Sequence, residues 1–335
     1  MSEISDLHDK FFKDTFSQLA IARDFIEQYV PSEIVAALDL TTLTLQKDSF
    51  VDETLQEYFS DILYDVELRQ GGTSAVYFLF EHKSYPDKWS ALQLLGYMVQ
   101  IWERELKKAR KDGGRNLPIK LSPIIPLLVY HGEKRWQIDP QFAALFDIPT
   151  GFERYFPNFQ FQLTDLSEAS AQTIRGLETT QFVLQVMRYI RSDQLRTQLV
   201  YLLHLAQSAT DSTLTEHLIY VSIRYMMYQR DDLTFEDYQR AITQARLPQG
   251  DAVMATLAQQ LISEGVQIGW QGGRQEGIRG SILNLLQLRF QVVPSNVDRR
   301  LATIDDIQTL NQLLESAALA ASMDTFTNKL RRLTH

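Results

Sequence analysis

The spacing of apolar and polar residues predicts two helices and several strands in the first 130 residues. Apolar residues recur at helical spacing over residues 8–29 and 87–111, and each range predicts one amphipathic helix. Strand patterns occupy residues 41–45, 61–68, 75–80 and 123–130. The last two are almost continuously apolar, as expected for strands that are buried on both faces of a sheet. A sheet combined with helices in this order predicts an α/β fold.

The pattern becomes mostly helical after about residue 140. Few glycines interrupt residues 165–245, and a glycine repeat begins in the helix predicted from about residue 251. We therefore predict three regions: an α/β unit at 1–140, a helical region at 141–250, and a glycine-repeat helix with a C-terminal helical segment at 251–335.

Four glycines recur every four residues, at Gly265, Gly269, Gly273 and Gly277. Each glycine inside a helix costs about 1 kcal/mol relative to alanine, so a helix here needs a closely packed partner. A flexible linker is the alternative. We favour a helix that packs against another helix, either of this chain or of a second copy. In the second case the chain forms a homo-oligomer through residues 265–277.

Composition narrows the chemistry. The 335 residues include no cysteine, which excludes disulfides, thiolate catalysis and zinc–thiolate sites. The N-terminus is polar and acidic, and the longest apolar run, residues 124–129, is too short to cross a bilayer. We expect a soluble, cytoplasmic protein with no membrane partner.

The net charge of −9 counts mildly against nucleic acid as a partner, but one segment is strongly basic. Residues 104–120 carry seven basic and two acidic residues, a local charge of +5. Such a run is commonly a solvated helix face. The alternative is contact with a phosphate backbone, for which the candidates are Lys107, Lys108, Arg110 and Lys111.

Carboxylates and a lysine meet at the end of the predicted hairpin. Residues that pair in an antiparallel hairpin have numbers with a constant sum, and a loop centred on Gly71 places Asp61 opposite Glu81. A loop centred on Gly72 places Asp61 opposite Lys83. In either register Asp61, Glu81 and Lys83 share one face of the sheet, and His82 points to the other.

Two neighbouring carboxylates repel each other unless a cation lies between them. Mg²⁺ prefers oxygen ligands, and Asp61, Glu81 and the backbone carbonyl of His82 could supply three of them. Lys83 would orient the nucleophile or stabilise charge on the phosphate. An ordinary surface pair at a strand end is the alternative.

Five ordered blocks resemble the Rpn family of recombination-promoting nucleases, also known as YhgA-like transposases. They are residues 8–13, 60–63, 80–84, 97–103 and 126–132. The resemblance implies a PD-(D/E)xK restriction-endonuclease-like core of order αβββαβ, which hydrolyses DNA with Mg²⁺. Asp61 and Glu81 carry over as metal ligands and Lys83 as the catalytic lysine. Ser60 replaces the proline that names the superfamily motif, at a position that varies.

Gln93 and Tyr97 are four residues apart and therefore share a face of the predicted helix. The pair resembles the Gln-x-x-x-Tyr element of RecB-like nucleases, which implies a catalytic role for Gln93 and a DNA contact for Tyr97. The alternative is an exposed Gln93 and a core Tyr97. His8 and His131 belong to the matching blocks, but their spacing suits no local metal motif, so we expect each to be a structural histidine or one at the rim of the site.

The sequence thus predicts a Mg²⁺-dependent DNA endonuclease linked to recombination or mobile elements, in which Mn²⁺ can substitute. The rival hypothesis is a non-catalytic DNA-binding or assembly protein on a degenerate nuclease fold. The acidic net charge and the long helical half motivate the rival, whereas intact Asp61, Glu81 and Lys83 argue against it. Neither a phosphate-binding P-loop nor a serine-hydrolase elbow occurs.

Overall fold

The computed structural model describes residues 2–46, 62–70, 76–111, 120–248, 250, 252–257, 275–283, 285–287, 290, 293–320 and 322–333. These form two compact units, Met1–Met254 and Ala255–His335. Asp61 and three of the repeat glycines, Gly265, Gly269 and Gly273, lie outside the described residues, so the interpretations that depend on them stay predictions.

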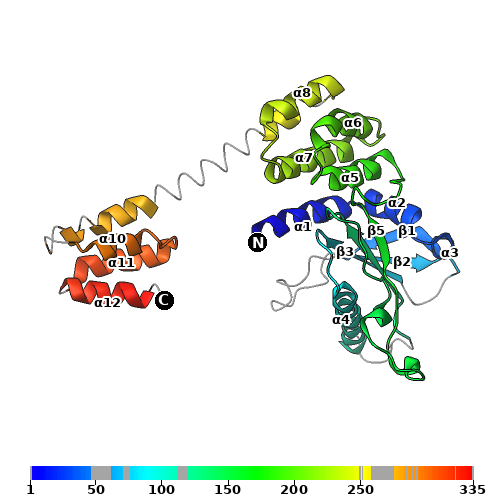
Figure 1. The fold of residues 1–335 in the computed structure, drawn as a ribbon, viewed down its shortest axis with the longest axis horizontal. Coiled ribbons are helices and arrows are strands. Elements are labelled where there is room, and N and C mark those ends of the chain that lie inside the picture. The colour runs from blue at the N-terminus through cyan, green and yellow to red at the C-terminus, as the bar shows by residue number, and fades with distance from the viewer. Residues whose placement is uncertain are drawn as a thin grey trace. The chain divides into compact units, whose positions relative to one another are not determined.

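The first unit combines a sheet with helices on both sides (Figure 1). Its strands are β1 (Leu38–Leu45), β2 (Ile62–Leu68), β3 (Val76–Lys83), β4 (Ile124–Tyr130) and β5 (Gln162–Asp165). Its first helices are α1 (Ser2–Phe16), α2 (Leu19–Tyr29), α3 (Ser32–Ala37) and α4 (Ser90–Lys111). After two 3-10 turns, η1 (Phe142–Leu145) and η2 (Glu153–Tyr155), come α5 (Glu178–Tyr189), α6 (Leu195–Gln207), α7 (Ser212–Gln229) and α8 (Phe235–Ala245).

The sheet has five strands in the order β1-β2-β3-β4-β5. The first three are antiparallel, whereas β4 and β5 run parallel to β3. A parallel neighbour requires a crossover, and α4 makes the one between β3 and β4. The predicted α/β class is confirmed. The sequence analysis missed β5, a strand of only four residues that lies beyond residue 140.

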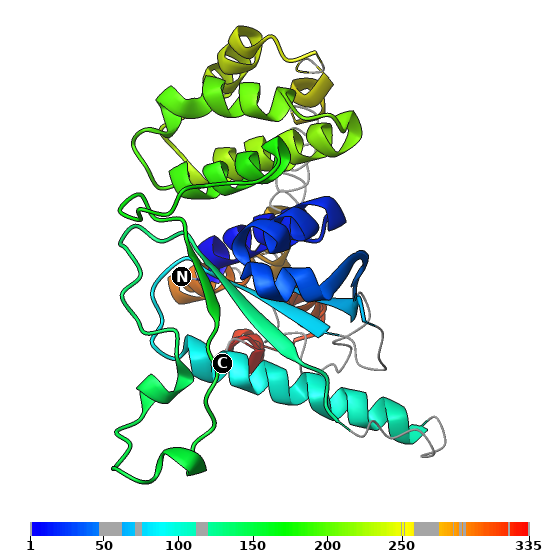
Figure 2. The same ribbon diagram turned by 90° about the vertical axis from the view of Figure 1, so that its right-hand side faces the viewer.

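Alternation along β3 divides its side chains between two helical layers. Phe78 and Phe80 are fully buried on the side of α1 and α2, where the Phe80 ring lies 5.6 Å from that of Phe16. Leu79 is buried on the other side, in a core that it shares with α4 residues such as Leu94. Helices α5 to α8 pack beyond α1 and α2, as Figure 2 shows. The strand is covered on both faces, as its apolar sequence predicted.

The prediction of one helix over residues 8–29 was wrong. The chain breaks at Ser17 and Gln18, where Gln18 adopts extended backbone angles before α2 begins. Thr15 donates its hydroxyl to the carbonyl of Phe11 at 2.8 Å, a contact of the kind that bends helices near their ends. The helical spacing of apolar residues continues across the break because both helices pack against the same face of the sheet, where Phe16 of α1 and Phe25 of α2 each contact Phe80.

The second unit is a small helical bundle. Its bounded helices are α10 (Ser295–Leu301), α11 (Ile307–Leu319) and α12 (Met323–Leu333), and residues 275–283 are also helical. Ile282, Leu310 and Phe326 are fully buried in its core. Gly277, the one described glycine of the repeat, is exposed, and a Cβ there would meet open space. Within the described residues, no helix is long and apolar enough to span a bilayer.

A buried carboxylate ties the helical region to the sheet unit. Asp24 of α2 is 4% exposed, and its Oδ2 accepts the backbone N–H of Leu177 at 2.8 Å, just before α5. Gly176 makes this approach with φ of +115°, a conformation that favours glycine. A Cβ at this position would lie 2.3 Å from Asp24 Oδ2. Gly176 is therefore required both by its backbone angle and by its neighbour.

We expect Gly176→Ala to lower the free energy of unfolding by about 3 kcal/mol or more. The added methyl group combines backbone strain with the loss of a buried hydrogen bond to a charged group. Gly151→Ala is the matched control, because Gly151 also has a positive φ (+91°) but nothing lies near its Cβ. Urea unfolding of both variants measures the difference, and equal destabilisation would refute the role of the Asp24 contact.

Candidate active site

The pairing of β2 with β3 follows one of the two registers that the sequence predicted. Ile62 pairs with Phe80 and Val66 pairs with Val76, so paired residue numbers sum to 142. This is the register centred on Gly71, and that alternative is confirmed for the described pairs. Ile62 follows Asp61 in the chain, and Phe80 precedes Glu81. The position of Asp61 itself lies outside the described residues.

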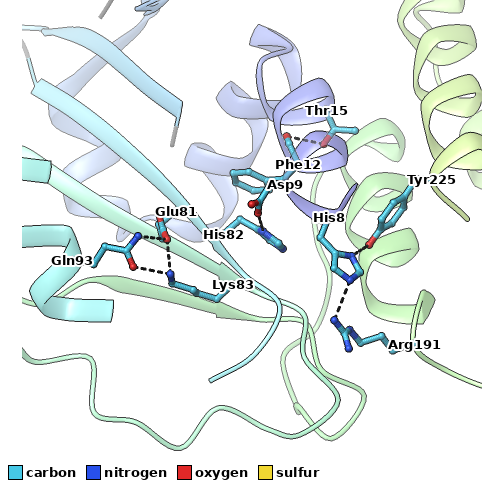
Figure 3. A network of polar contacts seen from close by, with 10 residues as sticks. All are labelled: His8, Asp9, Phe12, Thr15, Glu81, His82, Lys83, Gln93, Arg191 and Tyr225. Carbon is cyan, nitrogen blue, oxygen red and sulfur yellow. Dashed lines mark hydrogen bonds and ion pairs between the residues drawn. The ribbon is translucent and has the colours of Figure 1, made fainter. Parts of the chain in front are cut away.

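Glu81, Lys83 and Gln93 form one connected polar cluster at the carboxyl end of β3 (Figure 3). Lys83 Nζ lies 2.9 Å from Glu81 Oε1 and donates to Gln93 Oε1 at 2.7 Å. Gln93 Nε2 donates to Glu81 Oε1 at 3.1 Å, and it also donates to the hydroxyl of Tyr97. A neutral amide suits this place because it offers an acceptor to the cation and a donor to the anion.

The cluster holds two charges in a nearly dry environment. Glu81 is 1% exposed and the Lys83 side chain 11%. Burial opposes the charge on Lys83, but the neighbouring Glu81 carboxylate and its hydrogen bond outweigh burial and raise the pKa of Lys83 above its ordinary value. Lys83 is therefore a cation at neutral pH, suited to electrostatic stabilisation rather than to proton abstraction.

One carboxylate oxygen of Glu81 has the character of a ligand position. Oε2 is buried and has no hydrogen-bond partner among the described residues. A bare, buried carboxylate oxygen is costly unless a cation or donor meets it, so this oxygen fits a divalent metal. No group of three histidine, aspartate or glutamate side chains that could hold a metal occurs in the described part of the chain. Further ligands would have to come from Asp61, backbone carbonyls, water or substrate.

His82 lies on the opposite face of β3, as the alternation predicted. Its side chain is 2% exposed, and Nδ1 donates to Asp9 Oδ1 of α1 at 2.9 Å. The carbonyl of Lys83 accepts from His131 on the β4 side. Because successive carbonyls in a strand point to opposite sides, the carbonyl of His82 faces the β2 side of the strand end. In the sequence, Asp61 directly precedes Ile62, the first residue of β2.

The basic residues of α4 lie toward the far end of that helix from Gln93. Lys107 and Arg110 are exposed, and the side chains of Lys108 and Lys111 lie outside the described atoms. Fourteen residues separate Gln93 from Lys107, about 21 Å along the helix axis. Trp102, between them, donates to the carbonyl of Ser122 just before β4. The basic end of α4 therefore lies toward the amino-terminal end of β4, whereas Glu81 lies at the carboxyl end of the parallel strand β3.

Comparison with known proteins identifies the family. The model described as "Putative transposase, YhgA-like" matches residues 6–217. The chain belongs to this YhgA-like family. No solved structure matches it.

Three proteins of Escherichia coli that are similar to this chain have the word nuclease in their names. "Recombination-promoting nuclease RpnD" of strain O157:H7 is 30% identical, over 76% of this chain and 93% of the relative. "Recombination-promoting nuclease RpnC" of strain K12 is 29% identical, over 78% and 82%. "Inactive recombination-promoting nuclease-like protein RpnE" of strain K12 is 28% identical, over 87% and 93%.

A buried histidine cluster behind β3 was missed by the sequence analysis. His8, His82 and His131 are each 5% exposed or less, and their ring centroids lie 4.7 to 6.4 Å apart. Tyr225 of α7 and Arg191 contact His8 at 2.5 and 3.0 Å. The expected structural role of His8 and His131 agrees with this burial. The signal in the sequence that points to this histidine cluster is the pair His8-Asp9, which lies in the family-like block at residues 8–13.

Burial makes His8 sensitive to acid. Burial, and then the charges of Arg191 and His82, lower the pKa of His8 from 6.5 to about 3. The unfolded chain takes up this proton near pH 6.5 and the folded chain only near pH 3. The stability that His8 contributes is therefore complete above pH 6.5 and is lost as the pH falls toward 3.

We expect His8→Gln to reduce the loss of stability between pH 6.5 and 4.5 by about 2 kcal/mol relative to the wild type. Glutamine retains polar atoms near Tyr225 and Arg191 but does not titrate. His204→Gln is the control, because His204 is exposed and should follow the wild-type curve. Urea unfolding at several pH values measures the slopes, and parallel slopes for His8→Gln and wild type would contradict the assignment.

Proposed function

We propose that this protein is a divalent-metal-dependent DNA endonuclease that acts in recombination or on mobile elements, with Mg²⁺ as the metal and Mn²⁺ as a substitute. The observation that carries the proposal is the buried Glu81 carboxylate beside the Lys83 ammonium, because one of its oxygens has no hydrogen-bond partner among the residues that the structure describes. Membership of a family whose relatives are named recombination-promoting nucleases supports it. The order of helix, three strands, helix and strand supports a PD-(D/E)xK core.

Each residue of the cluster has a role that follows from its contacts. Glu81 would hold the metal through Oε2, together with Asp61 and the carbonyl of His82. When bound, the metal would neutralise negative charge at the scissile phosphate. The ammonium of Lys83 has three donors, and two of them face Glu81 and Gln93 among the described residues. The third can reach a phosphate oxygen or orient the attacking water.

Gln93 would keep these groups aligned during hydrolysis. Its amide bonds both members of the ion pair, and the hydroxyl of Tyr97 limits how that amide can turn. The reaction adds water at phosphorus and breaks one bridging P–O bond, and charge grows on the other oxygens in the transition state. A preoriented Lys83 lowers the cost of that charge because it needs little rearrangement.

The exposed basic end of α4 suits DNA some distance from the cleaved bond. A separation of about 21 Å from Gln93 corresponds to about six base pairs of duplex. Lys107 and Arg110 would therefore contact flanking phosphates, and Lys108 and Lys111 would add to the same basic segment. Such contacts would make binding salt-dependent without changing the chemistry at Glu81.

A second candidate function is a non-catalytic DNA-binding or assembly protein on the same fold. The relative of this chain named as inactive, which aligns with 87% of it, favours this alternative. The cluster of Glu81, Lys83 and Gln93 argues for catalysis, because its buried charge is costly and a binding protein needs no such cluster.

Nicking of supercoiled plasmid tests the proposal. We expect wild type to nick DNA with Mg²⁺ or Mn²⁺ and to be inactive in EDTA. Asp61→Ala and Glu81→Ala should each lower the rate at least about a thousandfold, since each removes a ligand that no other residue replaces. Gel assays with each metal measure the rates.

The same assay separates the alternatives. Equal cleavage by wild type and both variants would indicate a contaminant. No cleavage by wild type in any metal, together with retained DNA binding, would favour the binding-protein function and refute the nuclease.

A separate prediction concerns Gln93. We expect Gln93→Ala to slow nicking about 10- to 100-fold, because Lys83 and Glu81 lose the amide that orients both. Glu103→Ala is the control, as Glu103 is exposed on the same helix. Initial rates under metal saturation measure the effect, and a Gln93→Ala rate equal to wild type would exclude an orienting role.

A further inference from the structure

Behind the end of β3 that carries Glu81 and Lys83, one side chain of the strand makes a directional contact with α1. His82 lies between them in sequence and projects to the opposite face, where it enters the layer formed by α1 (Figure 3). Any twist of the strand end about its own axis would move His82 one way and the two candidate catalytic side chains the other. The orientation of the His82 ring is therefore coupled to that of Glu81 and Lys83.

The His82 ring is held by one hydrogen bond at its edge and by two aromatic rings that stack on its faces. Asp9 accepts from Nδ1 at 2.9 Å, and because a carboxylate oxygen only accepts, the Nδ1 atom carries the proton. The ring of Phe12 stacks on His82 at 5.3 Å with an interplanar angle of 27°. The ring of His131 stacks on it at 4.7 Å and 20°. One hydrogen bond and two stacked rings leave little freedom for rotation.

Of these contacts, only that of Asp9 is directional. Stacked rings can slide past each other at small cost, whereas a hydrogen bond to a charged acceptor sets both distance and angle. Asp9 comes from α1, whose position is itself fixed by other contacts. Among these, the ring of Phe11 stacks on that of Tyr225 at 4.3 Å, and the ring of Phe16 lies 5.6 Å from that of Phe80. The hydrogen bond from His82 to Asp9 therefore holds the end of β3 in a fixed position relative to α1.

We propose that Asp9 is a positioning residue for the candidate active site and acts on Glu81 and Lys83 through His82. This inference rests on the proposed function. A shift of a ligand by about 0.5 Å is enough to weaken a metal site or slow a reaction, and residues that orient ligands commonly contribute 10- to 100-fold. The carbonyl of His82, which faces the β2 side, would shift with the ring.

Two readouts on four variants test this role. The readouts are the Mn²⁺ dissociation constant, measured by calorimetry without DNA, and kcat and KM for plasmid nicking. We expect Asp9→Ala to weaken Mn²⁺ binding about tenfold and to lower kcat about 10- to 100-fold, with KM for DNA changed less than about twofold. Asp9→Asn should recover most of both values, because its amide oxygen still accepts from Nδ1.

Tyr64→Phe is the matched control for a purely structural effect. It removes another buried hydrogen bond between α1 and the sheet, but from β2 rather than from the strand end. It should lower stability and leave Mn²⁺ affinity and kcat near wild type. His82→Leu serves if Asp9→Ala does not fold. Leucine leaves no unpaired ring nitrogen, Asp9 is already 29% exposed to water, and the expected losses are those of Asp9→Ala.

The outcomes separate this inference from the proposed function. Wild-type Mn²⁺ affinity and kcat in Asp9→Ala or His82→Leu would overturn the positioning role, as would equal losses in Tyr64→Phe. A wild type that binds Mn²⁺ without cleaving DNA would refute the nuclease alone, since the affinities still decide the role of Asp9. A wild type that does neither would overturn both proposals.

Discussion

The arrangement around β3 depends on keeping the Glu81 carboxylate buried and charged. A carboxylate that is 1% exposed loses its hydration, and Lys83 and Gln93 replace that hydration at one oxygen only. Within the described part of the chain, the other oxygen has no hydrogen-bond partner. This imbalance is unfavourable for a purely structural ion pair, which would satisfy both oxygens. It agrees with the proposed metal site, in which a cation would complete the coordination of Glu81.

The two faces of β3 differ in chemical character. The face toward α4 carries the polar cluster. On the face toward α1 the rings of Phe78, Phe80 and His82 are buried, and Asp9 of α1 accepts a hydrogen bond from His82. This division lets the strand present charge on one side while apolar packing stabilises it on the other. Helices α5 to α8 add a further layer, because Tyr225 and Arg191 contact His8 next to the rings that surround His82.

The family match explains why the helical region belongs with the sheet. It covers residues 6–217, from α1 into α7, and so includes β3 together with most of the layers behind it. Asp24 and Gly176 join the two regions with a close contact that tolerates no added side-chain atom. A helical region attached in this way supports the sheet unit and is not a separate appendage. The residues from Ala255 onward form their own compact unit.

Sequence alone determined those features that follow from backbone geometry over short stretches. The two-residue alternation of a strand places Glu81 and Lys83 on one face and His82 on the other, and the 3.6-residue period of a helix places Gln93 above Tyr97. The hairpin narrowed the register to two choices, of which the structure has the one centred on Gly71. Only the tertiary structure decided which amide bridges the ion pair and where the first helix breaks. It also showed that Asp9 meets His82 and that His8 meets Tyr225, 217 residues away. These contacts join elements that are distant in the chain, and no local period encodes them, because they arise only when the layers pack together.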